Sequence, residues 1–206
     1  MNFIPVYLIC FLIFVAWLFY EQRKSQKQEK KNSDEFWARE TEANRTRNKD
    51  ISQLPLLHVQ ESEIPLVQTD NPSVLYYIDH IRDLIKSPMM DLSEFSNTDL
   101  KLAYGVGNFK QLSEYDQNFN SFLSALSDLA LSYTEAGYLP EAQDTYRLAF
   151  YYGSQKVSDY TGLADVYLRL EQPEHITALI EEVEAGTHPR KSSVIRALQE
   201  VLMHYQ

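Results

Sequence analysis

The feature that most constrains the fold is a recurrence of apolar residues at an offset of 34 in the C-terminal half of the chain. Each step of 34 carries one helical apolar stripe onto another. The stripes are Leu126, Leu129, Ala130 and Tyr133; Tyr160, Leu163, Ala164 and Tyr167; and Val194, Ala197, Leu198 and Val201. A period of this length indicates one helical hairpin per repeat, whose apolar face is buried by stacking on its neighbours. The sequence therefore predicts an all-α array.

The second helix of each hairpin matches at the same offset. Apolar positions of one map onto apolar positions of the next: Ala142, Tyr146 and Ala149 onto Ile176, Ile180 and Val183. We predict repeats over about 123–156 and 157–190, with a capping helix over about 190–205, because terminal repeats need a cap.

The helical domain is expected to begin at residue 71 and to include residues 71–206. Asn71 is a favourable N-cap and Pro72 a favourable first residue of a helix that ends before Pro88. A shorter helix is expected over residues 98–104.

A 34-residue helix-turn-helix period with a small residue between large ones resembles the tetratricopeptide repeat. The resemblance implies a protein-interaction groove. Ser154 stands where the family usually has a proline between repeats.

A narrower resemblance links the chain to a family of uncharacterised tetratricopeptide-like proteins of Gram-positive bacteria that carry an N-terminal membrane anchor. It rests on Asn97–Lys101, Tyr104-Gly105, Asn108, Glu114–Asp116 and Phe36–Asn44. This resemblance implies an architecture and no established activity.

An uncharged apolar run extends from Phe3 to Tyr20. As a helix it rises about 27 Å, close to the bilayer hydrocarbon thickness of about 30 Å. Trp17 near its end suits the interfacial aromatic belt. A cleaved signal peptide is the alternative, but no basic residue precedes the run and no small-x-small site follows it. We therefore predict a single transmembrane anchor over residues 1–21.

The one cysteine, Cys10, lies inside this apolar run. A single cysteine excludes a disulfide framework and a thiolate metal site. A lipoprotein site is not indicated either, because the preceding segment is short and lacks a basic start.

Charge is divided unevenly along the chain. Residues 1–31 carry five basic and two acidic residues, a net charge of +3, whereas the remainder carries 14 basic and 27 acidic residues, a net charge of −13. Positive charge is retained on the cytoplasmic side of a membrane, so the C-terminal body is predicted to face the cytoplasm. The acidic body predicts no nucleic-acid partner, since such affinity rests on Lys and Arg neutralising phosphates.

Residues 22–50 are predicted to form a charged juxtamembrane linker that is partly helical. Residues 21–35, which include the start of this linker, have no apolar face, and they predict a solvated spacer. A short helix is expected from Asp34 to Asp50, docking Phe36 and Trp37 on the membrane surface or on the body.

Residues 51–70 contain two prolines, Pro55 and Pro65, each followed by aliphatic residues. Proline and the residue before it favour extended backbone. We therefore predict an extended strap that lies across the helical body.

The first helices of stacked hairpins line a concave groove. The 34-residue mapping places these candidates on it: Ser124, Ser127, Leu131, Thr134, Ser158, Thr161, Asp165, Leu168, Ile195 and Gln199. The set is small, neutral and mildly apolar, and it lacks the Lys and Asn side chains with which chaperone-binding tetratricopeptide proteins hold a terminal carboxylate. It predicts an apolar segment of a protein or peptide as ligand, and residues 51–67 of this chain are one possible occupant. The alternative, that these side chains only pack, stays open.

Catalytic patterns are missing from the sequence. The five histidines have no metal-ligand spacing, and neither a nucleophile elbow nor a phosphate-binding loop is present. We expect no enzyme activity, no cofactor, no metal and no small-molecule substrate.

The predicted function is that of a membrane-tethered, cytoplasm-facing scaffold or adaptor. One alternative is an envelope-facing accessory or chaperone-like factor that assists secreted-protein folding or cell-wall assembly. Another is an enzyme with no motif visible in the sequence.

Overall fold

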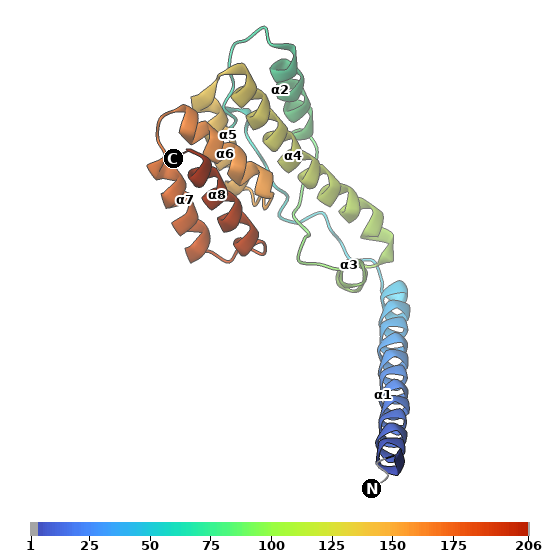
Figure 1. Ribbon diagram of the computed structural model, residues 1–206. Helices are drawn as coiled ribbons and strands as arrows, with labels where there is room; N and C mark the ends of the chain where they lie inside the picture. Colours follow the sequence, from blue (N-terminus) through green and yellow to red (C-terminus); the bar gives the residue numbers. More distant parts are fainter. Residues whose placement is uncertain (1–3, 206) are drawn as a thin grey trace. The chain divides into compact units, whose positions relative to one another are not determined.

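The computed structural model describes residues 4–205, without the side chains of residues 4–10, 13, 16 and 205. Over that range the regular elements are eight α-helices and two short 3-10 helices, and extended pairing is limited to an isolated antiparallel bridge between Leu57 and Met89. The predicted all-α class is confirmed. The chain forms two compact units (Figure 1): Met1–Gln53 with Glu94–Lys110 (unit 1), and Leu54–Ser93 with Gln111–Gln206 (unit 2).

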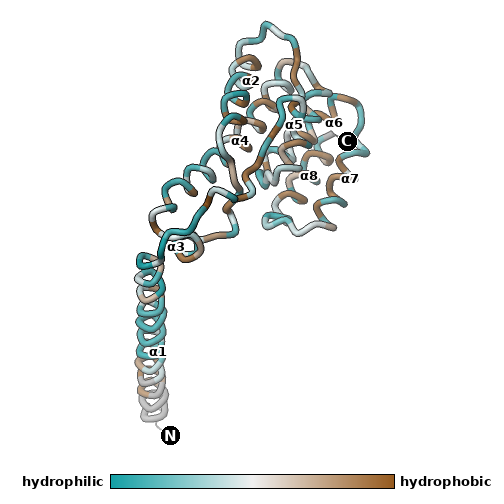
Figure 2. The backbone as a smooth tube through the Cα atoms, turned by 180° about the vertical axis from the view of Figure 1, so that it is seen from behind, coloured by the Kyte–Doolittle hydropathy of each residue, from teal (hydrophilic) through white to brown (hydrophobic). Residues whose placement is uncertain are grey.

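The first helix, α1, runs without a break from Ile4 to Arg45. Residues 21–35, predicted as a solvated spacer, are exposed and belong to this continuous helix, so the helix extends further than expected. The physical reason is that neither Gly nor Pro occurs between Pro5 and Pro55, while Glu, Lys, Gln and Arg are strong helix formers. Residues 21–35 are exposed, and Figure 2 shows this part of α1 as hydrophilic.

Over the residues that the structure describes, no helix combines the length and the apolarity of a segment that crosses a membrane. Of the predicted anchor, Phe3 and the side chains of residues 4–10, 13 and 16 lie outside the described part of the chain. The anchor over residues 1–21 stays a prediction.

In unit 1, α3 (Asn97–Tyr104) packs against α1 and is followed by the 3-10 helix η2 (Val106–Asn108). The Glu40 carboxylate of α1 accepts hydrogen bonds from Thr98 and from Lys101 of α3, and Ala43 is fully buried. Residues 94–110 thus pack with the N-terminal helix, although the sequence predicted one helical domain over 71–206.

Phe36 and Trp37 do not supply this docking. Their side chains are 55% and 62% exposed, and they form an edge-to-face pair with each other on α1. Polar contacts of Glu40 and the small Ala43 hold α3 instead. The two aromatic side chains are thus not buried in unit 1, and their docking on the membrane surface stays a prediction.

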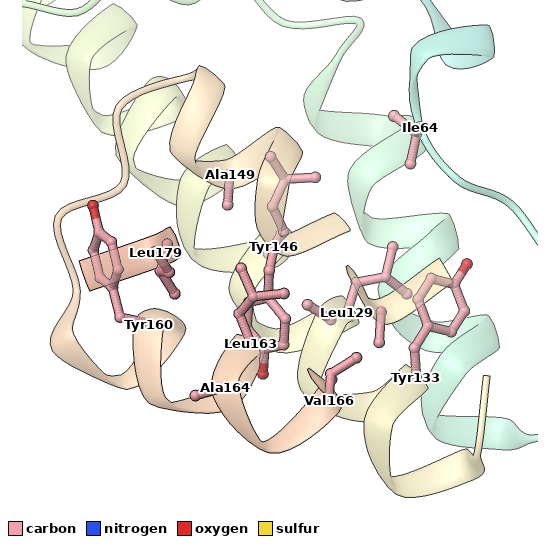
Figure 3. Packing of buried hydrophobic residues seen from close by; sticks show 14 of the residues in the cluster. Ile64, Leu129, Tyr133, Tyr146, Ala149, Tyr160, Leu163, Ala164, Val166 and Leu179 are labelled. Atoms are coloured by element: carbon pink, nitrogen blue, oxygen red, sulfur yellow. The ribbon is translucent and has the colours of Figure 1, made fainter. Parts of the chain in front are cut away.

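Unit 2 is an array of helices that pack on one shared core. Its helices are α2 (Pro72–Leu84), α4 (Phe109–Ala136, whose first two residues belong to unit 1), α5 (Leu139–Tyr151), α6 (Val157–Arg169), α7 (Glu174–Ala185) and α8 (Lys191–Tyr205). α6 packs against α5, α7 and α8. Figure 3 shows side chains that meet in this core, among them Leu129, Tyr133, Tyr146, Leu163 and Leu179.

The two hairpins of unit 2 end their first helices in the same way, 34 residues apart. The Tyr138 N–H donates to the Tyr133 carbonyl at 2.9 Å, and the Gln172 N–H donates to the Tyr167 carbonyl at 2.9 Å. The residue before each donor has a positive φ, +86° at Gly137 and +59° at Glu171. This is the Schellman arrangement, which satisfies carbonyls at a helix end.

Residues 54–70, here called the strap, follow an extended path with one 3-10 turn, η1 (Glu61–Glu63). Val59 and Ile64 of the strap are buried in the core of unit 2. Three tyrosine hydroxyls hold its backbone and side chains: Tyr133 donates to the Pro65 carbonyl at 2.7 Å, Tyr138 contacts the Thr69 hydroxyl at 2.9 Å, and Tyr152 contacts the Glu63 carboxylate at 2.7 Å. Figure 2 shows the strap along one side of α4 and α5.

Candidate functional site

The candidate site is a groove of unit 2 made of three hollows that share residues. The first lies between α2 and α4, the second between α4 and α6, and the third between α6 and α8. Asp128 lines both the first and the second hollow, and Thr161 lines both the second and the third. The hollows are therefore neighbours, and together we call them the α2–α8 groove.

The first hollow has a volume of about 620 Å³ and polar walls. α2 contributes Tyr76 and His80, whose rings are stacked at 6.1 Å, and Tyr76 is 64% exposed. α4 contributes Asn120, Ser124 and the exposed Asp128. These groups offer an aromatic face and several hydrogen-bonding side chains to a ligand.

The second hollow, of about 370 Å³, carries most of the predicted groove residues. Leu131 of α4 is 49% exposed and lines this hollow together with the exposed residues Asp128 of α4 and Asp165 of α6. Thr134 and Ser127 lie at its base; the Thr134 hydroxyl donates to the Ala130 carbonyl one turn earlier in α4, and the Ser127 hydroxyl lies 3.0 Å from the Leu123 carbonyl and 2.8 Å from the Asp159 carboxylate. The hydroxyls at the base of the hollow thus have hydrogen-bond partners within unit 2, whereas Asp128, Leu131 and Asp165 are exposed to solvent.

Tyr146 of α5 also lines the second hollow and is 2% exposed. Burial raises the pKa of its hydroxyl to about 12, because the charged phenolate is disfavoured away from water. The ring passes close to α6 at Gly162, where a Cβ would lie 2.3 Å from the Tyr146 hydroxyl oxygen. Gly162 therefore makes room for the tyrosine below the groove.

A buried carboxylate joins the two hairpins beneath the second hollow. Asp159, in the first turn of α6, is 2% exposed and its Oδ2 accepts from the Ser127 hydroxyl at 2.8 Å and from the Ser154 hydroxyl at 2.5 Å. Buried carboxylates persist when they are hydrogen-bonded in this way. Ser154 thus connects the turn before α6 to Asp159, whose carboxylate also accepts from Ser127 of α4.

The third hollow, of about 460 Å³, is mainly apolar. Leu168 of α6 faces Ala197 and Val201 of α8 across it, with Glu200 and His204 also on the α8 side. This part of the groove can take an apolar side chain.

The structure brings most of the predicted groove residues together. Ser124 lines the first hollow; Ser127, Leu131, Thr134, Ser158, Thr161 and Asp165 line the second; Leu168 lines the third. Ile195 and Gln199 line none of the three. On α8 the stripe that faces the groove is Ala197, Glu200, Val201 and His204 instead, whereas Ile195 packs partly against the core.

The predicted neutral character is wrong for the first two hollows, both of which Asp128 lines, and the predicted mildly apolar character is wrong for the first hollow only. Asp128, Lys156 and the α2 residues Tyr76 and His80 were missed. Asp128 has Gly162 at its equivalent position 34 residues later, so a search for matching residue types passes over it. α2 lies outside the 34-residue register, and no sequence signal placed it beside α4.

The strap does not occupy the groove. Each residue that lines the three hollows comes from α2, α4, α5, α6, α8 or the turn before α6, and none from residues 54–70. The expectation that residues 51–67 could fill the groove is therefore wrong for the described strap, whose apolar residues Val59 and Ile64 are already buried in the core.

The one pair in the groove that suggests nucleophilic chemistry is Ser127 with Lys156. The Lys156 ammonium lies 3.4 Å from the Ser127 hydroxyl and 3.2 Å from Ser124. A lysine acts as a base when it is desolvated, but Lys156 is exposed, and the Ser127 hydroxyl is already directed at Asp159 and the Leu123 carbonyl. Over the described residues no cluster of metal-ligating side chains occurs. The arrangement is suited to binding.

The class of protein that these features define is an all-α helical-hairpin array with an open, partly acidic groove. Comparison with known proteins finds no matching family model, no similar curated protein and no similar solved structure.

Proposed function

We propose that this chain is a membrane-tethered, non-enzymatic adaptor that binds a segment of a partner protein in the α2–α8 groove. The observation that carries the proposal is the openness of this groove in a unit that covers another side with its own strap. Leu131, at the centre of the groove, is 49% exposed although it lies between two helices of the core. A concave surface with a mainly apolar lining and a few polar groups is typical of a binding site.

The array is, in this proposal, of the tetratricopeptide type. Two features support it: the equivalent turns that follow Tyr133 and Tyr167, 34 residues apart, and a groove lined by the first helix of each hairpin, α4 and α6, together with α8. Stacked hairpins of this kind use such concave surfaces for proteins.

The tether is the apolar run from Phe3 to Tyr20. α1 continues as a helix from Glu21 to Arg45, which adds about 38 Å of exposed helix beyond the run at 1.5 Å per residue. Five basic residues within residues 21–31 support a cytoplasmic location of the helical body.

Site-specific photo-crosslinking in native membranes tests the adaptor function. A photoreactive residue at Leu131 is compared with one at Leu66, an exposed strap residue outside the groove. We expect a defined crosslinked protein from position 131 and not from position 66. Equal crosslinking from both positions, or none from 131, would contradict the proposal.

Sidedness is tested separately by thiol labelling of intact cells. Ser192→Cys places an exposed thiol on α8 in a Cys10→Ser background. The cytoplasmic assignment predicts labelling by an impermeant reagent only after permeabilisation. Labelling in intact cells would place the body on the outside.

A further inference from the structure

The α2–α8 groove changes character along its length, and this change points to a particular ligand. We infer that the groove binds an extended peptide that carries a basic side chain and an apolar side chain about three residues apart. The inference rests on the proposed function, since it specifies the ligand of the same groove.

The basic side chain is assigned to the second hollow. Asp128 of α4 and Asp165 of α6 are both exposed, and both line the hollow that Leu131 also lines. Over the described residues Asp128 has no ion-pair partner, and the cation nearest to Asp165 is Arg169 at 3.9 Å. The Arg169 guanidinium donates at 2.6 Å to the Thr134 carbonyl, so it is held at the end of α4. Two carboxylates facing one hollow favour a cation there.

Lys156 does not neutralise this pair. It lies at the start of α6, where its ammonium contacts Ser124 and Ser127. Asp165 follows it by nine residues, which is about 13 Å along a helix axis. Lys156 and Asp165 therefore lie toward opposite ends of the second hollow, and the ligand's basic group belongs at the Asp165 end.

The apolar side chain is assigned to the third hollow. Leu168, Ala197 and Val201 form its walls, and Glu200 with His204 supplies the polar part of its rim. An apolar side chain placed there covers aliphatic surface that water now contacts, which is the favourable term in such pockets.

The spacing follows from the helices that separate the two hollows. The second and third hollows meet at Thr161 of α6. Packed helices lie about 8–10 Å apart, and an extended chain advances about 3.3–3.6 Å per residue. Side chains that enter neighbouring hollows are therefore about three residues apart.

Selection from a displayed library of random decapeptides tests the inference, with the full chain in detergent micelles as bait and empty micelles for depletion. We expect enriched peptides to carry Lys or Arg about three positions from a large apolar residue. The best enriched peptide is then synthesised and its affinity measured by fluorescence anisotropy.

Matched variants assign each side chain to its hollow. The double variant Asp128→Asn with Asp165→Asn is expected to lower the affinity for the peptide about tenfold, because one exposed ion pair contributes at most about fivefold. Asp144→Asn changes an exposed acid on α5 outside the groove and should leave the affinity unchanged. Val201→Gln is expected to weaken the peptide about tenfold, while Met203→Gln, exposed on the same helix, does not.

The outcomes separate the two proposals. Enriched peptides that lose binding with Leu131→Arg but share no basic residue, or no fixed spacing to an apolar residue, would overturn the inference and leave the adaptor function standing. Peptides that are insensitive to every groove variant would overturn both.

Discussion

Two faces of unit 2 share α4 and differ in what covers them: the strap covers one face, and the other is open. On the strap face, the hydroxyls of Tyr133, Tyr138 and Tyr152 reach residues 63–69, and Ile64 is buried. On the groove face, the Thr134 hydroxyl donates to its own helix and the Ser127 hydroxyl lies 2.8 Å from Asp159 of α6, while Asp128 and Leu131 are left exposed. One face is completed by the chain itself. The other has its buried polar groups satisfied and still presents charge and apolar surface to a ligand.

The largest effect is expected from the strap face. Ile64→Ala removes a side chain that is 4% exposed in the core, and such truncations cost about 2–5 kcal/mol of unfolding free energy. Leu66→Ala, at a strap position that is 36% exposed, should cost about 0.5 kcal/mol or less. Urea unfolding of the full chain, followed by circular dichroism, measures both. Equal losses would mean that the strap does not contribute to the core.

A smaller effect is expected below the groove. Gly162→Ala places a methyl group 2.3 Å from the Tyr146 hydroxyl oxygen, so the ring or α6 must shift at a cost of about 1–3 kcal/mol. Thr161→Ala, one residue earlier on the rim, is the matched control. Gly162→Ala should also weaken the binding of any ligand in the groove, because Tyr146 lines the second hollow. A stability unchanged from the native chain would contradict this packing.

Alkaline pH should lower the free energy of unfolding through one tyrosine on each face. Burial raises the pKa of Tyr133, on the strap face, and of Tyr146, below the groove, from the ordinary 10.0 to about 12. The unfolded chain loses these protons first, so the stabilisation is complete below pH 10 and is lost as pH rises to about 12. Tyr146→Phe should flatten this dependence, whereas Tyr151→Phe, 79% exposed, should leave it unchanged. A slope that Tyr146→Phe does not alter would contradict the assignment.

The smallest effects are expected at the equivalent turns, which are common to both faces. Glu171 holds φ +59° where Gly137 holds +86°, and a side chain in this region costs about 1–2 kcal/mol. Glu171→Gly should therefore stabilise by about 0.5–1 kcal/mol after the greater chain entropy of glycine is subtracted, while Gly137→Ala should destabilise by about 1 kcal/mol. Thermal unfolding measures the pair. Shifts of the same sign would show that the turns are not equivalent.

The sequence predicted the parts of the fold that depend on apolar periodicity. The stripes through Leu126 and Leu163 defined the hairpins, and Pro55 with Pro65 indicated the extended strap. The continuous α1 was missed because a helix of exposed Lys, Glu and Gln needs no apolar face when helix formers run unbroken. The docking of α3 depends on Glu40, Thr98 and Lys101, polar residues more than 50 positions apart, which no periodicity connects.

For the groove, the 34-residue offset located most residues of the second hollow, buried and exposed, but not all of its exposed side chains. Ser127, Thr134 and Thr161 follow from the repeat, but the exposed Asp128 and the α2 pair Tyr76 and His80 have no counterpart in the next repeat. The residues of α8 that line the groove also differ from the predicted ones. Val194 and Leu198 are buried in the core, and this orientation of α8 directs Ala197 and Val201 toward the third hollow.

The most direct test of the central claim is hydrogen exchange of the full chain with and without the selected peptide, read by mass spectrometry. The account predicts slower exchange in residues 124–134, 158–168 and 194–204 when the peptide is bound, and unchanged exchange in residues 54–70. Slower exchange in the strap with no change in α4 and α6 would contradict it, because the ligand would then bind the face that the chain already covers.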